Sequence, residues 1–403
     1  VTWESAGTLQ NGELIVDPGV TLTIKGALTI QGSVAIKGGG KIVRGSGNAM
    51  FTMASGGNLT LEDILIDGAS MSSANSMISV DYSNAKLTMN AGSKIQNCIY
   101  SSGYGAAIHI TGTTVINGGE IANCTAERGG AIAVQSGNLT IEYAVIENCT
   151  ATSLGGGIYI RPATLVIKDG IFRNNKTTSS NIASWTGGGF LCQCSSKVTI
   201  YGGQFIGNTT AAHGGAIYHC GCGGTTTDIR GGYFEGNTCT YPKYKGSGAI
   251  YNSSQYDGVT SLTFSGKVHF VGDGSTESGM DGVYLDKKSG SAYLRKSYIS
   301  DTLSYPVNLY LEAEEGRVIA EGVNEYRLLH ERDMKKINFV DTGDSGKTWY
   351  AVLNEDTNEV YVSETNPNYK YYVYYISNGA EGTVVDDGKY DIGADVTVQP
   401  DDE

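Results

Sequence analysis

The amino-acid sequence predicts an all-β protein that folds as a right-handed, single-stranded parallel β-helix, with three short strands per coil and a less regular, β-rich C-terminal cap. Three observations support this fold class. The 403 residues include 57 glycines and only 6 prolines. Three short motifs recur along the chain with a period of roughly 25 to 33 residues. Apolar and polar residues alternate within these motifs, as they do in β-strands.

The first motif is a glycine pair or a close relative, followed by Ala or Gly and a large apolar residue. It reads GAAIHI, GGAIAV, GGGIYI, GGGFLC, GGAIYH and SGAIYN. Alternation in GGAIAV directs Ile132 and Val134 inward and Ala133 outward. The equivalent inward residues are predicted to be Ile108, Ile132, Ile158, Phe190, Ile217 and Ile250.

Two further motifs complete each repeat. One reads SKIQNC, GEIANC, AVIENC, GIFRNN, GQFIGN and GYFEGN, and the other is a strand-like run such as NLTIE, TLVIK, KVTIY or SLTFS. A unit this small cannot bury its own apolar face, so successive units must stack on one another. Three strands per repeat of this length are typical of a parallel β-helix.

The regularity of the repeat defines the predicted domains. We expect the β-helix to occupy residues 1–366, with 281–366 as the final coils and the cap, and residues 367–403 to form a linker and a partial module. The formal net charge is −13; residues 281–403 hold 24 acidic and 12 basic side chains, against 17 and 16 in residues 1–280. There is neither a basic stripe nor an apolar run of transmembrane length. We therefore expect no nucleic-acid partner and no membrane insertion by this segment.

The alternating GGAI and FxxN tetrapeptides resemble the repeats of the polymorphic outer-membrane protein family and of adhesin-like β-helix proteins of bacterial surfaces. GGAI stands at 129–132 and 214–217, and FxxN at 172–175, 205–208 and 234–237. The resemblance covers roughly residues 49–275, and it implies a bacterial surface protein that binds a partner.

The C-terminal stretch YKYYVYYISNGAEGTVVDDGKYDIGADVTVQPDDE resembles the first half of the small β-grasp repeat of internalin-type surface proteins. This resemblance implies a piece of a longer, multi-module protein that is secreted or attached to the cell wall.

A cysteine-rich stretch, HGGAIYHCGCGG at residues 213–224, raises the question of a metal site. Superposing GGGFLCQC on GGAIYHCGC predicts that Cys192 lies opposite His219 and Cys194 opposite Gly221, on coils about 4.8 Å apart. Four thiols and one imidazole then gather in a small volume, namely Cys192, Cys194, His219, Cys220 and Cys222.

These five side chains allow two interpretations. A zinc site needs four ligands that converge at about 2.0 to 2.3 Å, but Cys192 and His219 are expected to point inward and Cys220 outward. A disulfide between adjacent coils needs only a Cα separation of about 4.4 to 6.8 Å. We therefore predict buried or disulfide-bonded thiols and no cofactor, with zinc as the alternative.

A second set of cysteines follows asparagines at equivalent points of successive coils. We expect Asn97, Asn123 and Asn148 to form a hydrogen-bonded ladder, with their neighbouring cysteines as small apolar fillers. Those cysteines are Cys98, Cys124 and Cys149.

Aromatic residues in two long insertions indicate a binding site. Both insertions lie between the FxxN motif and the next glycine pair, so they should protrude from one edge of the stack, carrying Trp185, Tyr241 and Tyr244. Aromatic faces on loops of a rigid scaffold suit sugar rings or protein surfaces. A further outward row of tyrosines could extend this platform, although tyrosine is also common on half-exposed sheet faces. The row consists of Tyr159, Tyr218 and Tyr251.

Catalysis is the weaker expectation. A glycosidase needs two carboxylates across a groove, whereas Asp169, Asp228 and Glu235 are scattered and stand beside Lys168, Arg230 or an open turn. We therefore predict an adhesin-like rod that binds host or microbial surface glycan or protein through loops. The alternatives are a polysaccharide-degrading lyase or glycosidase, and a passive spacer within a larger surface protein.

Overall fold

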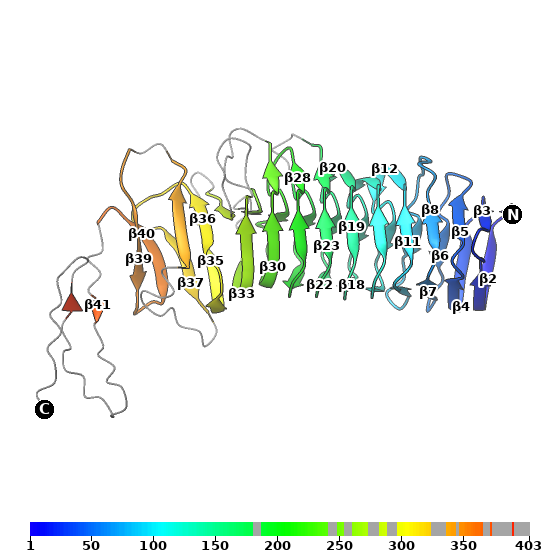
Figure 1. Ribbon diagram of the computed structural model, residues 1–403, viewed down its shortest axis with the longest axis horizontal. Helices are drawn as coiled ribbons and strands as arrows, with labels where there is room; N and C mark the ends of the chain where they lie inside the picture. Colours follow the sequence, from blue (N-terminus) through cyan, green and yellow to red (C-terminus); the bar gives the residue numbers. More distant parts are fainter. Residues whose placement is uncertain are drawn as a thin grey trace, which may run out of the picture.

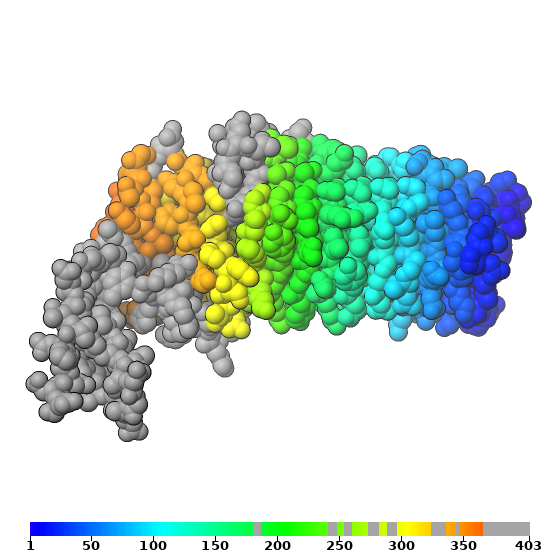
Figure 2. All heavy atoms as spheres, in the orientation of Figure 1, coloured from blue at the N-terminus to red at the C-terminus, as the bar shows by residue number. Residues whose placement is uncertain are grey.

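The computed structural model describes residues 1–179, 187–240, 248–253, 260–272, 282–287, 296–323, 336–343 and 346–365, and the backbone of 371–372 and 389–390. Every described element is a strand, so the predicted all-β class is confirmed. The strands lie side by side along one long axis, from the N-terminus at one end to β39 and β40 near the other (Figure 1). In the space-filling view the successive coils form one continuous rod (Figure 2).

Successive coils contribute strands to three parallel rows. The first row, formed by the first motif, contains β6 (Phe51–Met53), β9 (Ile78–Val80), β13 (Ile108–Ile110), β17 (Ile132–Val134), β21 (Ile158–Ile160), β25 (Leu191–Gln193), β29 (Ile217–His219), β32 (Ile250–Asn252), β34 (Val283–Leu285), β36 (Val307–Leu311) and β38 (Ile337–Asp341).

The second row is formed by the strand-like runs. It contains β7 (Asn58–Glu62), β10 (Lys86–Met89), β14 (Thr113–Ile116), β18 (Asn138–Ile141), β22 (Thr164–Ile167), β26 (Lys197–Ile200), the first halves of β30 (Thr226–Glu235) and β33 (Ser261–Val271), β35 (Ser297–Leu303) and β37 (Val318–Gly322).

The third row is formed by the motif that ends in asparagine. It contains β1 (Thr2–Trp3), β3 (Thr21–Ile24), β5 (Lys41–Arg44), β8 (Leu65–Asp67), β11 (Lys94–Gln96), β15 (Glu120–Ala122), β19 (Val145–Glu147), β23 (Ile171–Arg173), β27 (Gln204–Ile206) and the second halves of β30 and β33. Near the N-terminus, β2 (Gly7–Ile15) and β4 (Leu28–Lys37) each run through the first and second rows.

A short sheet and a C-terminal antiparallel pair complete the described elements. The short sheet lies between the third and first rows and contains β12 (Ile99–Tyr104), β16 (Thr125–Arg128), β20 (Thr150–Leu154), β24 (Lys176–Thr177), β28 (Thr209–Thr210) and β31 (Thr238–Cys239). At the other end, β40 (Glu359–Ser363) pairs antiparallel with both β37 and β39 (Tyr350–Asn354). Beyond it, β41 (Tyr371–Tyr372) pairs with β42 (Lys389–Tyr390).

No helix among the described residues is long and apolar enough to cross a membrane.

One coil of the first row departs from the predicted register. Leu191, and not Phe190, pairs with Ile158 of the coil before it and Ile217 of the coil after it. The superposition of the two cysteine motifs was therefore wrong by one residue.

The corner glycines explain the shift. Gly188 and Gly214 have left-handed φ angles of 70° and 68° and mark the same corner in successive coils. A Cβ atom on Gly188 would lie 2.1 Å from the carbonyl oxygen of Leu191, so glycine is needed there. Counted from this corner, Phe190 occupies the place of Ala216, and the following residue enters the strand.

Stacked side chains fill the inside of the coils. Phe172, Phe205, Phe234 and Phe270 form a column in the third row, with ring centroids 5.0, 4.5 and 5.0 Å apart. Phe190 packs against this column, 4.6 Å from Phe172. Such ladders bury each residue against its equivalent one coil away and hold the rod together.

The asparagine ladder lies one position further along the chain than predicted. Asn148 is an exposed corner residue with a left-handed φ of 55°, whereas Cys149 after it is buried. In later coils this buried position is Asn, and Nδ2 of Asn175 donates to Oδ1 of Asn208 at 3.0 Å, as Asn208 does to Asn237 at 2.9 Å. The cysteines are buried fillers as expected, but the ladder does not involve the residues that precede them, Asn97, Asn123 and Asn148.

Candidate functional site

The structure places only part of the predicted binding platform. Trp185, Tyr241 and Tyr244 fall outside the described residues. The tyrosine row is described, and it is buried rather than half-exposed: Tyr159, Tyr218 and Tyr251 expose 2%, 1% and 3% of their surface. The platform prediction for this row is therefore wrong.

The buried row is a structural ladder on the outside of the first row. Tyr251 stacks on Tyr218 and Tyr284 with centroids 5.8 and 5.4 Å apart, and His213 lies against it at 4.3 Å. Burial, followed by the carboxylate of Asp286, raises the pKa of Tyr251 well above its usual value, and the same two causes raise that of Tyr284 to about 12. These phenols pack and do not present a ligand surface.

The corrected register separates the predicted metal ligands. His219 lies opposite Gln193 and points into the coil, where its Nδ1 is 2.6 Å from Nε2 of Gln193 and 2.8 Å from Oγ1 of Thr227. Cys192 lies opposite Tyr218 on the outside. Neither residue joins the one group that the described residues offer to a metal, which is Cys194, Cys220 and Cys222.

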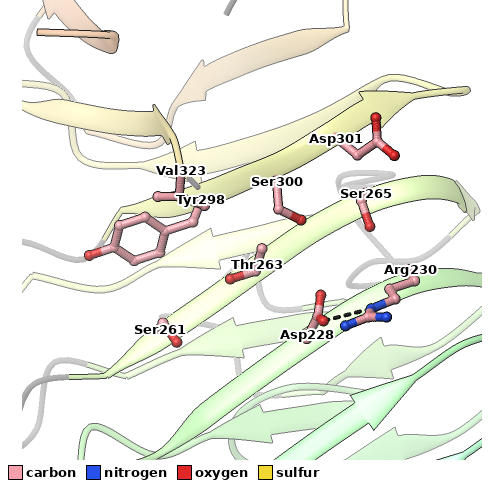
Figure 3. A pocket seen from close by; sticks show the side chains of 9 residues that line it. All are labelled: Asp228, Arg230, Ser261, Thr263, Ser265, Tyr298, Ser300, Asp301 and Val323. Atoms are coloured by element: carbon pink, nitrogen blue, oxygen red, sulfur yellow. Dashed lines mark hydrogen bonds and ion pairs between the residues drawn. The ribbon is translucent and has the colours of Figure 1, made fainter. Parts of the chain in front are cut away.

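A polar groove lies on the outside of the second row, where β30, β33 and β35 are adjacent (Figure 3). Its volume is about 570 Å³. It is lined by Asp228, Arg230, Ser261, Thr263, Ser265, Tyr298, Ser300, Asp301 and Val323.

Strand alternation explains why polar side chains face this groove. Leu262, Phe264 and Ile299 are buried in the core, so the residues between and beside them point outward. Thr263 is in register with Asp228 of the preceding coil and Tyr298 of the following one. The three side chains thus form one line across three coils, at the strand spacing of about 4.8 Å.

An ion pair fixes one wall of the groove. Nε of Arg230 donates to Oδ2 of Asp228 at 2.7 Å, and this hydrogen bond raises the pKa of Arg230. The guanidinium also lies 5.0 Å from the ring centroid of Tyr201, a residue that is 47% exposed. This wall therefore combines a hydrogen-bond acceptor and a donor, and the ring of Tyr201, which is not among the lining residues, packs against the guanidinium.

A lysine lies beside the ring of Tyr298 at the opposite end. Nζ of Lys296 is 5.7 Å from that ring centroid and forms ion pairs with Glu321 and Glu359 at 2.5 and 3.0 Å. Burial disfavours the ammonium ion, but these two hydrogen bonds outweigh it and raise the pKa of Lys296. Tyr298 is therefore held between the groove and a charged cluster.

Aromatic rings also gather beyond the corner between the second and third rows. His269 lies 5.5 Å from Tyr233 and 4.1 Å from Tyr305, which is 41% exposed. Because β33 runs through both rows, Ser265 in the groove and His269 in the stack belong to one strand. None of these three rings is among the residues that line the groove.

The groove suits a ligand rich in hydroxyl groups. Serine and threonine hydroxyls both donate and accept hydrogen bonds, carboxylates accept them, and Tyr298 offers a ring face. Two carboxylates, Asp228 and Asp301, line the same groove, and sugar hydrolysis also uses a pair of carboxyl groups.

Most of this groove was not predicted from the sequence. The sequence indicates Asp228 beside Arg230, and the structure contains that pair, but it also indicates Asp169 beside Lys168, whereas Lys168 forms an ion pair with Glu142. The alternation in SLTFS and SYIS was the available signal. The repeat pattern is lost between these runs, so spacing alone could not set their register.

The comparisons support the architecture. A family model described as a right handed beta helix region matches residues 53–234. No curated protein and no solved structure matches the chain. Together with the parallel rows, this match identifies the fold as a right-handed parallel β-helix, which adhesins and polysaccharide-degrading enzymes share.

Proposed function

We propose that this chain is an adhesin-like rod of a bacterial surface that binds a glycan in the groove over β30, β33 and β35. The observation that carries the proposal is the line of Asp228, Thr263 and Tyr298 across three successive coils. A saccharide chain laid along the rod would meet a carboxylate, a hydroxyl and an aromatic ring in turn. A rigid β-sheet holds these groups in place without ordering a loop, which lowers the entropic cost of binding.

The charge of the groove favours a neutral sugar over an anionic one. Arg230 is paired with Asp228, and Asp301 adds a second carboxylate at the rim. A strongly anionic polymer would meet two carboxylates and one paired cation. We therefore infer a neutral surface glycan as the ligand class, in a protein that is secreted or attached to the cell wall.

A polysaccharide-degrading enzyme is the second candidate. It is favoured by the presence of two carboxylates in one groove, since glycosidases use one carboxyl group as an acid and another as a base or nucleophile. Turnover would appear as release of reducing sugar from a glycan that the protein binds. Asp301→Asn should then abolish turnover but leave binding in place.

A glycan array screened with three matched variants tests the proposal. Tyr298→Ala removes the ring in the groove, Trp185→Ala with Tyr241→Ala and Tyr244→Ala removes the predicted loop aromatics, and Tyr143→Ala removes a tyrosine that is 42% exposed and lies outside the groove. Circular dichroism should show that each variant is folded.

We expect binding to be lost in Tyr298→Ala alone. Loss only in the loop variant would move the site to the insertions, as the sequence predicted. If the wild-type protein binds no glycan, the groove proposal fails and a passive spacer becomes the working function.

A further inference from the structure

Three cysteines that the groove does not use converge at one point on the outside of the first row. The Sγ atoms of Cys194, Cys220 and Cys222 all lie within 4.8 Å of one another. Cys222 lies within disulfide reach of both partners, with Cα separations of 5.7 Å to Cys194 and 5.4 Å to Cys220. A sulfur atom forms one disulfide at a time, so an internal disulfide among the three leaves one cysteine as a thiol.

From this arrangement we propose that Cys194, Cys220 and Cys222 form a thiol–disulfide exchange site, in which Cys222 alternates between two partners. With Cys194 it forms a bond between successive coils, and with Cys220 a bond within one CGC turn. The proposal is independent of the function of the groove.

Local structure brings the three sulfurs together. The backbone N–H of Cys194 donates to Ile160 and that of Cys220 donates to Gln193, which places the two cysteines at equivalent positions of adjacent coils. The chain then turns after Cys222, where the backbone N–H of Thr225 donates to the carbonyl oxygen of Cys222 at 3.2 Å. Oγ1 of Thr225 donates to the carbonyl oxygen of Cys222 at 2.7 Å and fixes this turn.

The hydrogen bonding favours Cys220 as the attacking thiolate. The backbone N–H of Cys222 donates to Sγ of Cys220 at 3.3 Å. A hydrogen bond to sulfur stabilises the thiolate, which is the form that attacks a disulfide. The thiolate of Cys220 attacks Sγ of Cys222, the bond from Cys222 to Cys194 breaks, and Cys194 leaves as the thiolate.

Exposure indicates where an external partner enters. Cys222 is 8% exposed, against 3% for Cys194 and 1% for Cys220. A low-molecular-weight disulfide would oxidise Cys222 first, giving a mixed disulfide and one released thiol. Attack by Cys194 or Cys220 then releases the second thiol and closes the internal disulfide, so the external disulfide takes up the two electrons.

Tryptic mapping without reduction separates the two isomers. The protein is equilibrated with oxidised glutathione, and the remaining thiols are alkylated after an acid quench. The masses of the tryptic peptides are then measured by mass spectrometry. Cleavage after Lys176, Lys197 and Arg230 places Cys192 and Cys194 on one peptide and Cys220 and Cys222 on the next. One isomer cross-links the two peptides, and the other closes a ring within the second peptide.

We expect both isomers in the wild-type protein. Cys220→Ser should leave only the cross-linked pair and Cys194→Ser only the internal ring. Cys222→Ser should lose the ring, and any cross-link that remains must join Cys194 to Cys220, whose Sγ atoms also lie within 4.8 Å of each other. Cys149→Ser is the matched control, since Cys149 is fully buried in a different cysteine stack and should not change the map.

Other results would overturn the proposal. One such result is three alkylated cysteines in the oxidised wild-type protein. Another is a single isomer that added glutathione does not redistribute. A third is a stoichiometric metal whose removal is needed before any of the three reacts; this would assign the site to metal binding instead. Mapping of the wild-type protein decides between these outcomes even if a serine variant fails to fold.

Discussion

Thr263 of β33 lies in register with Tyr298 of β35, one coil further along the rod, and both face the same groove. The coil-to-coil register that stacks apolar side chains inside also aligns polar side chains outside. A binding surface on this fold is thus a direct consequence of the repeat, because equivalent outward positions always lie side by side.

The buried asparagine ladder should be among the most sensitive parts of the rod. Asn208 donates to Asn237 and to the carbonyl oxygen of Phe172, and it accepts from Asn175. Asn208→Ala leaves several buried polar groups unpaired, at about 1 to 3 kcal/mol for each group. We expect the free energy of unfolding in urea to fall by at least about 2 kcal/mol. Asn174→Gly, at an exposed corner with a φ of 55°, is the control and should change it by far less.

At some corners glycine should be required for two reasons: the left-handed φ angle, and the lack of room for a Cβ atom. Gly188 and Gly236 have similar φ angles of 70° and 62°, but only at Gly188 would a Cβ atom meet a neighbour. Gly236→Ala should cost about 1 kcal/mol for the left-handed conformation alone. Gly188→Ala should lower the free energy of unfolding by clearly more than Gly236→Ala does. Thermal denaturation should therefore give a lower midpoint temperature for Gly188→Ala. An equal loss of stability in the two variants would contradict a steric role for Gly188.

Stability should fall in acid because of Asp67. This carboxylate is desolvated, but its hydrogen bonds from Lys41, Gln96, Asn97 and the Ala69 N–H outweigh burial and lower its pKa to about 2. A lowered pKa stabilises the fold above the unfolded value of 3.8, and this contribution is lost as the pH falls from about 4 to about 2. It amounts to at most about 2 kcal/mol.

Urea unfolding of wild type and Asp67→Asn across this range measures the contribution. The wild-type protein should lose more stability than the variant between pH 5 and 2. Parallel curves would show that Asp67 is not responsible.

A buried phenol of the tyrosine ladder should ionise at a higher pH than an exposed tyrosine does. Because burial and Asp286 raise the pKa of Tyr284 to about 12, its contribution to stability is complete below the usual value of 10 and is lost as the pH rises through 12. An ultraviolet titration of folded protein should show a late component near pH 12 that Tyr284→Phe reduces. Complete ionisation near pH 10, with the circular dichroism unchanged, would mean that the ladder is not buried.

The sequence predicted the architecture well because a repeat constrains every coil at once. The inward positions of Ile132 and Ile158 followed from alternation and spacing alone. Prediction failed where the motif was ambiguous: three glycines before Phe190 allowed two registers, and only the corner φ angles distinguish them.

The burial of a side chain was harder to predict from the sequence than the side of the strand to which it points. Tyr218 and Tyr251 do point outward from the coil, but other parts of the chain cover them, and no local pattern reveals such cover. The groove was missed for a different reason, since Thr263 and Tyr298 become neighbours only once the register is known across a stretch of sequence that lacks the repeat motifs.

The central claim, that the groove binds a glycan, is tested most directly by a crystal structure of the protein with the saccharide that binds best on the array. The account predicts electron density for the sugar over β30, β33 and β35, in contact with Asp228, Thr263 and Tyr298. Density at another surface, with this groove filled only by water, would contradict it.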